Sequence, residues 1–539
     1  MTLKKQLSKI DINIVLIIVF VAFICFYGYL DPQNQSFVAH DEGLYVGRAK
    51  RIIDAKDWFT PFHYPHHKTI GSYWLISICI KFLGISEFSA RFPSGLFSIL
   101  SSICVYLTAK EFISKGSSLL AAILLPSMPL WYQYSRYASP DIPFVFFVLI
   151  SSYCLIKSYS QFNFRTSSYE VLLFFSGFFI GIAFLVRSFM VFIPIFGLIP
   201  YFLSIKNFWT KINIRLFLFG LLVGLIPSML AIIISLHHYG IESIYSLTDF
   251  VKYKTAGGSF TKSLFFYPLN IIILSLPLSL LSTLGIEALL DKKDKVRNSY
   301  FILYPLIILG ILVFISSRHS HYTLILYPHI AFFFGFAAER LKDKGRKLSR
   351  KMGIQLAILF FTIGLMLSLL LIASKFSIGS ISIDLFNTYE YPIVLLSLIY
   401  LLFSSTFFLR QISSRSQLMF FVGICALQIT ALTYLYGNGI MGNPNTDFKS
   451  FAKSEIINKL SNSNIIYLYQ MNGKVRTLSQ VYFPSYKHIS NSLQDLPKPS
   501  YVMIENNELA KIVLIQNENK EFSLEKIANY KDWNMLRLD

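Results

Sequence analysis

The sequence predicts a polytopic α-helical membrane protein with about thirteen transmembrane helices and a small C-terminal α/β domain outside the membrane. Two compositional observations indicate this class. Only 14% of the 539 residues are charged and 54% are hydrophobic, whereas soluble domains carry about 25% charged residues. The mean hydropathy is +0.54. A third observation is that apolar runs recur at about 20 residues, the length that crosses a bilayer as a helix.

The apolar runs can be assigned as spans by their length. The predicted spans are 12–30, 92–112, 117–134, 141–157, 170–186, 188–204, 216–236, 264–284, 300–316, 322–338, 353–373, 391–409 and 417–437. The run 72–84 is ambiguous, because as a helix it would be about 20 Å long against about 30 Å of hydrocarbon. It also contains Lys81. We expect this run to lie at the interface without crossing.

Basic residues in the short loops support that placement. With 72–84 at the interface, every short basic loop falls on the inner side, as the positive-inside rule requires. These loops contain Lys4, Lys5 and Lys9; Lys110 and Lys115; Lys157 and Arg165; Lys206, Lys211 and Arg215; Lys292, Lys293, Lys295 and Arg297; Arg340 to Lys351; and Arg410 and Arg415. We expect a cytoplasmic N-terminus and an outer C-terminus. Topology thus accounts for the net charge of +20, and nucleic acid is not an expected partner.

The composition changes after the last apolar run. Residues 438–539 are rich in Asn, Ser, Lys and Glu, with a helix-like stretch at 446–460 and strand-like runs at 464–469 and 500–505. We expect a membrane domain over 1–437 and an extracytoplasmic α/β domain over 438–539. The first outer loop, 31–91, belongs to the membrane domain in this prediction and contains interfacial helices.

An acid pair in that loop, Asp41 and Glu42, is the first candidate site. Two adjacent carboxylates just outside a first span are costly near lipid and indicate function. They open a predicted helix over 42–55 that also carries Tyr45. The alternative is that Asp41 only caps this helix. A helix N-terminus would lower the pKa of the carboxyl group, whereas burial near lipid would raise it.

Further polar residues also fall on the predicted outer side, where the positive-inside rule does not explain them. Arg136 and Asp141 flank Pro140 between two spans, and they form either a structural ion pair or part of a cavity that includes a second carboxylate. Arg187 ends another span. Arg318, His321 and Tyr322 form a basic, hydrogen-bonding corner that suits a phosphate or serves as an interfacial anchor.

The loop segment His63–Lys68 has a phosphate-binding and a metal-binding interpretation. Lys68 is a point charge that suits a phosphate. His67 and its neighbours could hold Zn²⁺, although their spacing matches no standard zinc motif. The five cysteines all lie in apolar runs without CxxC spacing, which excludes a zinc site built on thiolates. The sequence contains no Walker A, GxSxG, HExxH or DxD motif, and this argues against a cytoplasmic nucleotide-dependent enzyme.

The order of several motifs resembles that of a known superfamily. The motifs are Asp41-Glu42-Gly43-Leu44-Tyr45, Asp57-Trp58, Lys68 followed by Tyr73-Trp74, Phe88-Ser89-Ala90-Arg91-Phe92-Pro93-Ser94, Gly181-Ile182-Ala183-Phe184-Leu185-Val186-Arg187, and Ser316-Ser317-Arg318-His319-Ser320-His321-Tyr322 before Tyr327-Pro328. Over about residues 12–340 this order resembles C-type (GT-C) membrane glycosyltransferases, and within them the aminoarabinose lipid A transferase and protein O-mannosyltransferase group.

The resemblance implies thirteen spans and a sugar donor linked to polyprenyl (undecaprenyl) phosphate. It implies that Asp41 is the principal catalytic carboxylate, Asp141 the second acidic residue, and Lys68 a lysine near the lipid phosphate. Glu42 is included with the catalytic group, and Tyr45 with the substrate-binding residues. Many members have Glu-Lys-Pro where this chain has His67-Lys68-Thr69. A divalent metal, Zn²⁺ or Mg²⁺, would therefore depend on His67.

The expected activity is glycosyl transfer at the outer face of a bacterial inner membrane. Lipid A or a related glycolipid is the favoured acceptor, and a protein acceptor, as for a protein O-mannosyltransferase, is the alternative. A different class, a transporter or flippase for a lipid-linked anion, would place ionisable residues near the membrane midplane. In this sequence the charges cluster at one predicted face, which favours the enzyme. Membrane lipid is the remaining expected partner.

Overall fold

The computed structural model describes most of the chain. The described residues are 11–29, 32–39, 42–65, 67–163, 168–255, 260–291, 293–315, 318–342, isolated positions between 358 and 404, 414–439, 441–443, 445–471, 473–489, 493, 496–506, 509, 523–531 and 533–539. Asp41 and most of the predicted spans 353–373 and 391–409 lie outside this set. Predictions about them therefore stay predictions.

The chain divides into two compact units. The first contains Met1–Tyr27, Phe59–Ser72 and Arg91–Leu435, and the second contains Gly28–Trp58, Tyr73–Ala90 and Tyr436–Asp539. Part of the first outer loop therefore packs in one unit with the C-terminal segment. The predicted boundary at residue 437 separates regions of different composition, whereas the compact units are assembled from separate stretches of the chain.

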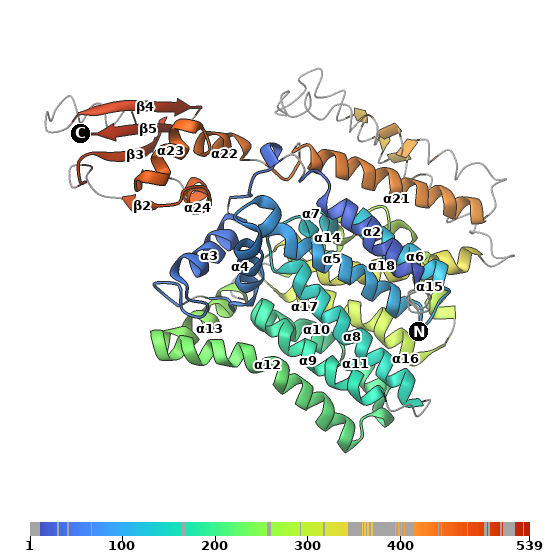
Figure 1. Cartoon of the computed structure of the whole chain (residues 1–539). Coiled ribbons are helices and arrows are strands. Elements are labelled where there is room, and N and C mark those ends of the chain that lie inside the picture. The colour runs from blue at the N-terminus through green and yellow to red at the C-terminus, as the bar shows by residue number, and fades with distance from the viewer. Residues whose placement is uncertain are drawn as a thin grey trace, which may run out of the picture. The chain divides into compact units, whose positions relative to one another are not determined.

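The first unit is built almost entirely of helices (Figure 1). Its α-helices are α2 (Ile12–Phe26), most of α5 (Glu87–Ala109), α6 (Lys115–Leu124), α7 (Pro129–Ser135), α8 (Asp141–Asn163), α9 (Tyr169–Arg187), α10 (Phe192–Gly197), α11 (Ile199–Ser204), α12 (Lys211–Tyr239), α13 (Glu242–Thr255), α14 (Phe260–Leu274), α15 (Ser279–Asp291), α16 (Lys295–Asn298), α17 (Tyr304–Phe314), α18 (Tyr327–Lys342) and most of α21 (Ser414–Gly437). Short 3-10 segments precede α7, α10 and α18, over Leu125–Ser127, Ser188–Val191 and Ser320–Leu326.

Six stretches among the described residues are long and apolar enough to cross a membrane. They are Glu87–Ala109, Asp141–Phe162, Tyr169–Ser204, Lys211–Tyr239, Lys295–Phe314 and Ser320–Lys342. A bent pair, Ser263–Leu274 and Ser279–Asp291, makes a seventh span if it is counted as one. The chain is therefore a polytopic helical membrane protein, while the total of thirteen spans stays a prediction.

Several predicted spans are interrupted helices. The predicted span 264–284 turns by 102° between its two halves. The predicted span 117–134 is divided into α6 and α7, with Pro126 and Pro129 at the junction. Hydropathy identified these regions but not the breaks, because a proline changes the helix direction without making a run less apolar.

Helices α9 and α12 pack against each other (Figure 1). Glycines form their contact. Gly177 and Gly181 on α9 face Gly220 and Gly224 on α12, and a Cβ atom on any of the four would lie less than 3.0 Å from backbone of the other helix. Small residues four apart let two membrane helices approach closely. This contact fixes α9, the helix that ends in Arg187.

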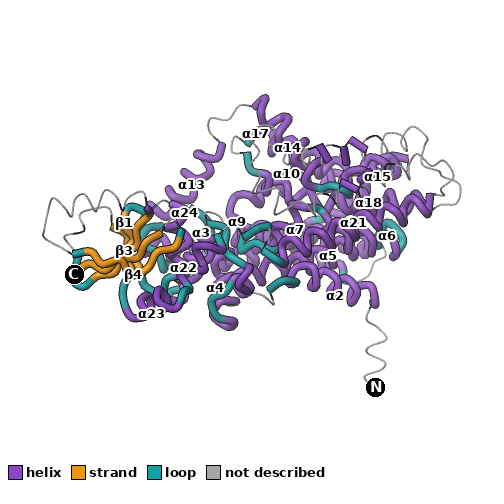
Figure 2. Tube along the Cα trace, turned by 90° about the horizontal axis from the view of Figure 1, so that it is seen from above, coloured by secondary structure: helices purple, strands orange, loops and turns teal. Residues whose placement is uncertain are grey.

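The second unit contains the strands of the chain's C-terminal part (Figure 2). Its elements are α3 (Glu42–Ala55), most of α4 (Gly71–Leu83), α22 (Thr446–Ala452), α23 (Glu455–Ser463), β1 (Ile466–Tyr469), α24 (Gly473–Tyr482), β2 (Tyr486–Ile489), β3 (Ser500–Glu505), β4 (Leu524–Tyr530) and β5 (Trp533–Leu538). The five strands form one sheet in the order β2-β1-β3-β5-β4. Strands β2, β1 and β3 are parallel, and β3, β5 and β4 are antiparallel.

Several elements of this unit were predicted from the sequence. The helix expected at 42–55 is α3, β3 has the predicted bounds 500–505, and β1 lies inside the predicted run 464–469. The helix-like stretch 446–460 is two helices, α22 and α23, separated at residues 453–454. One face of the sheet is covered by an apolar cluster that includes Val502, Ile504 and Leu536.

The glycine contact yields a stability prediction. Gly220→Ala should destabilise the protein by about 1–3 kcal/mol, because its Cβ would press on the backbone of α9. The matched control is Gly310→Ala in α17, where nothing lies within 4 Å of the added Cβ. Thermal unfolding of the purified chain in detergent measures both variants. Equal unfolding temperatures for the two would contradict the assigned role of the contact.

Candidate functional site

A pocket in the first unit brings several predicted site residues together. Asp141, Arg187, His321 and Tyr322 line it with six apolar residues, namely Phe144, Val145, Met190, Ile193, Leu324 and Ile325. The lining comes from the start of α8, the end of α9, the 3-10 segment Ser188–Val191, the start of α10, and the 3-10 segment before α18. Helix ends and short 3-10 segments therefore supply both the polar and the apolar side chains of the pocket.

Asp141 and Arg187 form an ion pair in this pocket. Their side chains are 6% and 14% exposed, so the pair is largely removed from solvent, and attraction between its charges is stronger than at a surface. Arg187 is held where it is because α9 ends there, and the next residue, Ser188, has φ +53°. The sequence predicted Arg136 as a possible ion-pair partner for Asp141; the observed pair is with Arg187.

Aromatic rings also surround the Arg187 guanidinium. Its central carbon lies 5.7 Å from the centre of the Tyr322 ring and 6.0 Å from that of Phe144. A guanidinium over an aromatic face gains cation–π attraction, especially when it is desolvated. Arg187 is thus oriented by one carboxylate and two rings, which leaves a preorganised cation beside the pocket.

The predicted basic corner surrounds His321. Its Nδ1 atom lies 3.1 Å from the Tyr134 hydroxyl, and its ring packs on those of His319 and Tyr322. The Nη1 atom of Arg318 is buried and makes no hydrogen bond to any described residue.

Tyr134 was missed from the sequence, although it stands only two positions before Arg136 at the same predicted helix end. Tyrosine is too frequent in this chain, with 32 copies, to be informative by itself.

The segment that carries Lys68 lies against the last turn of α9. The Thr69 hydroxyl donates a hydrogen bond to the Phe184 carbonyl at 3.2 Å, and Gly71 packs against Leu185. This contact places the backbone next to Lys68 at the end of α9, the helix that ends in Arg187. Around His67, no three His, Cys, Asp or Glu side chains among the described residues gather to hold a metal ion. A metal site that depends on His67 therefore stays a prediction.

Arg136 lies in a different setting. Its Nη1 atom donates to the carbonyls of Ile24 and Cys25 at 3.1 Å each, at the end of α2, and the residue is 2% exposed. A guanidinium there satisfies helix-terminal carbonyls that no intrahelical donor reaches. Substrate binding by Arg136 stays a prediction.

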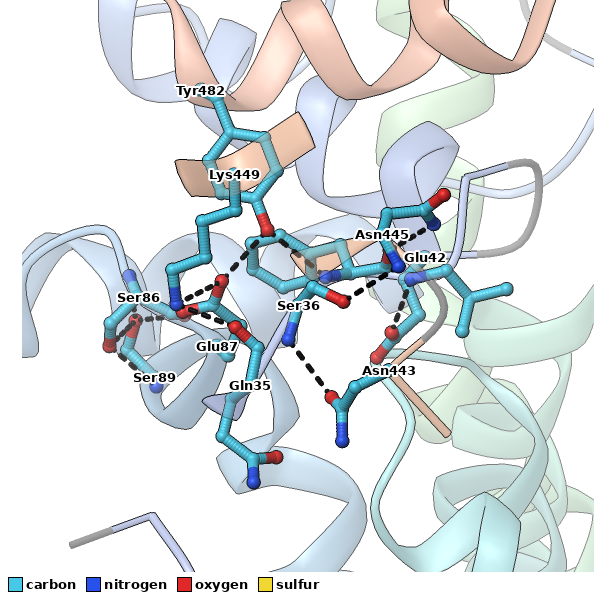
Figure 3. Close-up of polar contacts among 12 residues, drawn as sticks. Gln35, Ser36, Glu42, Ser86, Glu87, Ser89, Asn443, Asn445, Lys449 and Tyr482 are labelled. Carbon is cyan, nitrogen blue, oxygen red and sulfur yellow. Dashed lines mark hydrogen bonds and ion pairs between the residues drawn. The ribbon is translucent and has the colours of Figure 1, made fainter. Parts of the chain in front are cut away.

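The acidic loop, by which we mean the described residues 35–39 and 42 on either side of Asp41, belongs to the second unit. Glu42 is fully buried, and its Oε2 atom accepts a hydrogen bond from the Val38 backbone N–H at 2.9 Å (Figure 3). Tyr45 packs on Tyr73 with ring centres 5.5 Å apart, and Arg48 donates to the Tyr73 hydroxyl at 3.3 Å. Burial lowers the pKa of Lys50 on the same helix, although Asp54 opposes this shift. Asp41 itself is outside the described residues.

Comparisons with known proteins show which class of protein this chain is similar to. The family model described as dolichyl-phosphate-mannose-protein mannosyltransferase matches residues 67–234, the stretch that contains Lys68, Arg136, Asp141 and Arg187. The resemblance to C-type (GT-C) membrane glycosyltransferases that the motifs indicate is thus supported by an independent match.

Two relatives show which transferases the chain is similar to. The undecaprenyl phosphate-alpha-4-amino-4-deoxy-L-arabinose arabinosyl transferase of Wigglesworthia glossinidia brevipalpis is 31% identical over 222 residues, which is 40% of this chain and 37% of the relative. A transferase of the same description from Proteus mirabilis is 25% identical over 211 residues, 38% of this chain and 37% of the relative. The chain therefore matches just over a third of the length of these curated relatives.

Solved structures agree over nearly the whole chain. ArnT from Cupriavidus metallidurans, bound to undecaprenyl phosphate, has a TM-score of 0.73 with 14% identity and covers 97% of each chain. An Archaeoglobus fulgidus oligosaccharyltransferase has a TM-score of 0.51 with 13% identity, over 92% of this chain and 69% of its own. At these identities the similarity shows the fold. The predicted resemblance to the aminoarabinose transferase and O-mannosyltransferase group is confirmed.

The ion pair in the pocket yields a second stability prediction. Asp141→Asn should cost about 3 kcal/mol of unfolding free energy, because it leaves the Arg187 charge buried without its counter-charge. Asp141→Asn combined with Arg187→Met should cost less than the single variant, since no unpaired charge remains. A double-mutant cycle in detergent measures the coupling. Additive effects of the two substitutions would be inconsistent with a stabilising pair.

Proposed function

We propose that this chain is a glycosyltransferase that moves a sugar from polyprenyl phosphate, undecaprenyl phosphate in bacteria, to an acceptor at the outer face of the inner membrane. The observation that carries the proposal is the oriented Arg187 cation in the pocket of a chain with an ArnT-like fold. In this proposal the N-terminus is cytoplasmic and residues 438–539 are extracytoplasmic. Lipid A or a related glycolipid is the acceptor that the arabinosyl transferase relatives favour.

The proposed chemistry is a single displacement. The acceptor oxygen forms a bond to the anomeric carbon while the bond from that carbon to the phosphate oxygen breaks, and the electron pair stays on the leaving phosphate. This inverts the anomeric centre. Arg187, with Lys68 and Arg318, stabilises the charge that grows on the phosphate, which is the role that preorganised cations have in transfer reactions. His321 and Tyr322 shape the phosphate side of the pocket.

Asp141 acts through Arg187 in this scheme. The ion pair keeps the guanidinium oriented before the donor arrives, so little reorganisation is needed when the phosphate binds. Asp41 is proposed as the principal catalytic carboxylate, from the resemblance alone. If the acceptor is a hydroxyl group, Asp41 takes its proton. If the acceptor is a lipid A phosphate, the oxygen is already ionised and Asp41 orients it instead.

A protein acceptor is the second candidate. The matching family model describes protein mannosyltransferases, and its match includes the ion-pair residues Asp141 and Arg187. The donor chemistry would be the same, because dolichyl phosphate and undecaprenyl phosphate present the same phosphate to the pocket. The two candidate functions therefore differ only in the acceptor, a glycolipid or a protein.

Glycan analysis of cells tests the function and its acceptor. Mass spectrometry of lipid A and outer-face glycoproteins should show one sugar missing in cells without the chain and in cells with Asp41→Asn. Loss from lipid A supports the glycolipid acceptor, whereas loss from protein moves the acceptor to the second candidate. If all glycans are unchanged while lipid-linked sugar accumulates on one side of the membrane, the chain is a transporter and the proposal is wrong.

Arg187→Lys tests the donor site without removing the charge. Lysine keeps the cation but loses the planar fork and the stacking on Tyr322. With undecaprenyl phosphate-linked 4-amino-4-deoxy-L-arabinose as donor, KM for the donor should rise about tenfold. The control is Arg340→Lys, because Arg340 also pairs with carboxylates, those of Glu287 and Asp291, but does not line the pocket. A donor KM that is the same in both variants would remove Arg187 from the donor site.

A further inference from the structure

The stretch before the acid pair is bonded almost residue by residue to the C-terminal segment (Figure 3). Four of the five residues Gln35–Ala39 have a backbone group held by a side chain from residues 443–482. The contacts are Lys449 Nζ to the Gln35 carbonyl at 2.6 Å, the Ser36 N–H to Asn443 Oδ1 at 2.9 Å, the Phe37 N–H to the Tyr482 hydroxyl at 3.1 Å, Asn445 Nδ2 to the Phe37 carbonyl at 2.8 Å, and Thr477 Oγ1 to the Ala39 carbonyl at 2.7 Å. The fifth residue, Val38, donates its N–H to Glu42.

Most of this stretch is removed from water. Gln35, Ser36 and Phe37 are at most 1% exposed, and Glu42 is fully buried. Backbone groups in extended segments outside a sheet normally bond to solvent. Here a lost side-chain partner would leave a buried donor or acceptor unsatisfied, which costs more than the loss of an exposed hydrogen bond. The stretch is therefore fixed by the C-terminal side chains rather than by its own secondary structure.

A buried charge cluster anchors the same contacts. Lys449 pairs with Glu87 at 2.9 Å, with side chains 8% and 4% exposed, and the Tyr482 hydroxyl donates to the same carboxylate at 2.8 Å (Figure 3). Glu87 lies in the first turn of α5. One lysine and one tyrosine of the C-terminal segment therefore each link the 35–37 backbone to the start of this helix. Two side chains with two partners apiece hold the stretch rigidly.

The helix after the acid pair is held from the same side. A Cβ atom on Gly43 would lie 3.2 Å from the Thr477 carbonyl oxygen, and one on Gly47 would lie 2.9 Å from the Gln480 side chain. These glycines, four residues apart, let α3 approach α24 closely. Lys50, further along α3, donates to the Phe483 carbonyl at 2.9 Å. Both sides of the Asp41 position are thus attached to α22 and α24 or to the segments beside them.

We propose that Asn443, Asn445, Lys449, Thr477 and Tyr482 form a clamp that orients the acidic loop for glycosyl transfer. This inference rests on the proposed function, since it assigns positioning residues for that reaction. The clamp residues act through the loop backbone and do not themselves touch the sugar. A displacement of about 1 Å in a catalytic group can reduce a rate about a hundredfold. A loop fixed by several buried hydrogen bonds meets that requirement better than one that is free to fluctuate.

The test removes single atoms from the clamp in the full-length chain. Tyr482→Phe deletes the acceptor of the Phe37 N–H and the donor to Glu87. Thr477→Val deletes the donor to the Ala39 carbonyl with little change of shape. The matched control is Tyr469→Phe in β1, whose hydroxyl accepts a hydrogen bond only from its neighbour Gln470 among the described residues. Thermal unfolding identifies any variant that has lost its fold.

Two measurements read the clamp. In hydrogen exchange with mass spectrometry, Tyr482→Phe should accelerate exchange in a peptide over 36–39 about tenfold, and Tyr469→Phe should not change it. In transfer assays with undecaprenyl phosphate-linked 4-amino-4-deoxy-L-arabinose and lipid A, kcat should fall about tenfold in Tyr482→Phe and in Thr477→Val. KM for the donor should stay unchanged, because the donor phosphate is assigned to the Arg187 pocket. A variant that has merely lost folded protein would also show a lower rate, but thermal unfolding would identify it.

The outcomes separate this inference from the proposed function. Wild-type exchange rates over 36–39 in Tyr482→Phe, or a kcat equal to that of Tyr469→Phe, would overturn the clamp even if the wild-type chain transfers sugar. A wild-type chain without any glycosyltransferase activity would overturn the proposed function and the catalytic purpose of the clamp together. In that case faster exchange in Tyr482→Phe but not in Tyr469→Phe would still establish the mechanical hold on the loop.

Discussion

The ion pair between Asp141 and Arg187 is the interaction on which the pocket depends. A cation almost removed from water is stable only with a counter-charge nearby, and the carboxylate supplies it from the first turn of another helix. The position of Arg187 in turn requires that α9 ends there and that α9 lies close to α12, which the four glycines allow. The close packing of α9 on α12 through glycines therefore helps to place the Arg187 charge at the end of α9.

A second constraint is the number of helix ends. Within an uninterrupted helix the backbone groups are satisfied internally, so only side chains can offer polar groups. The interruptions after α9 and before α18 bring Arg187, His321 and Tyr322 to the same pocket. In the second unit the same need for polar groups is met differently, by side chains of the C-terminal segment that satisfy the backbone of Gln35–Ala39. In both regions the polar groups lie where a helix or strand ends.

Residue patterns predicted much of the candidate site but not its pairings. Asp141, Arg187, His321 and Tyr322 were all predicted from the sequence, because the positive-inside rule does not explain polar residues on the predicted outer side. An ion pair with Arg136, five residues away, was one of two alternatives for Asp141, because local spacing was the only guide. The structure pairs it with Arg187, 46 positions later, and directs Arg136 to the end of α2. Tyr134 was not identified at all, since its residue type is common here.

The sequence alone determined the membrane class, the helix 42–55 and the strand 500–505, because hydropathy and periodicity are local properties of the chain. Only the tertiary structure decided where the helices break, which charges meet, and that residues 28–58 and 436–539 fold into one unit. The reason is that such contacts depend on packing between segments that can be about 400 residues apart, as Ser36 and Asn443 are. A one-dimensional pattern contains no information on which buried donor will meet which acceptor.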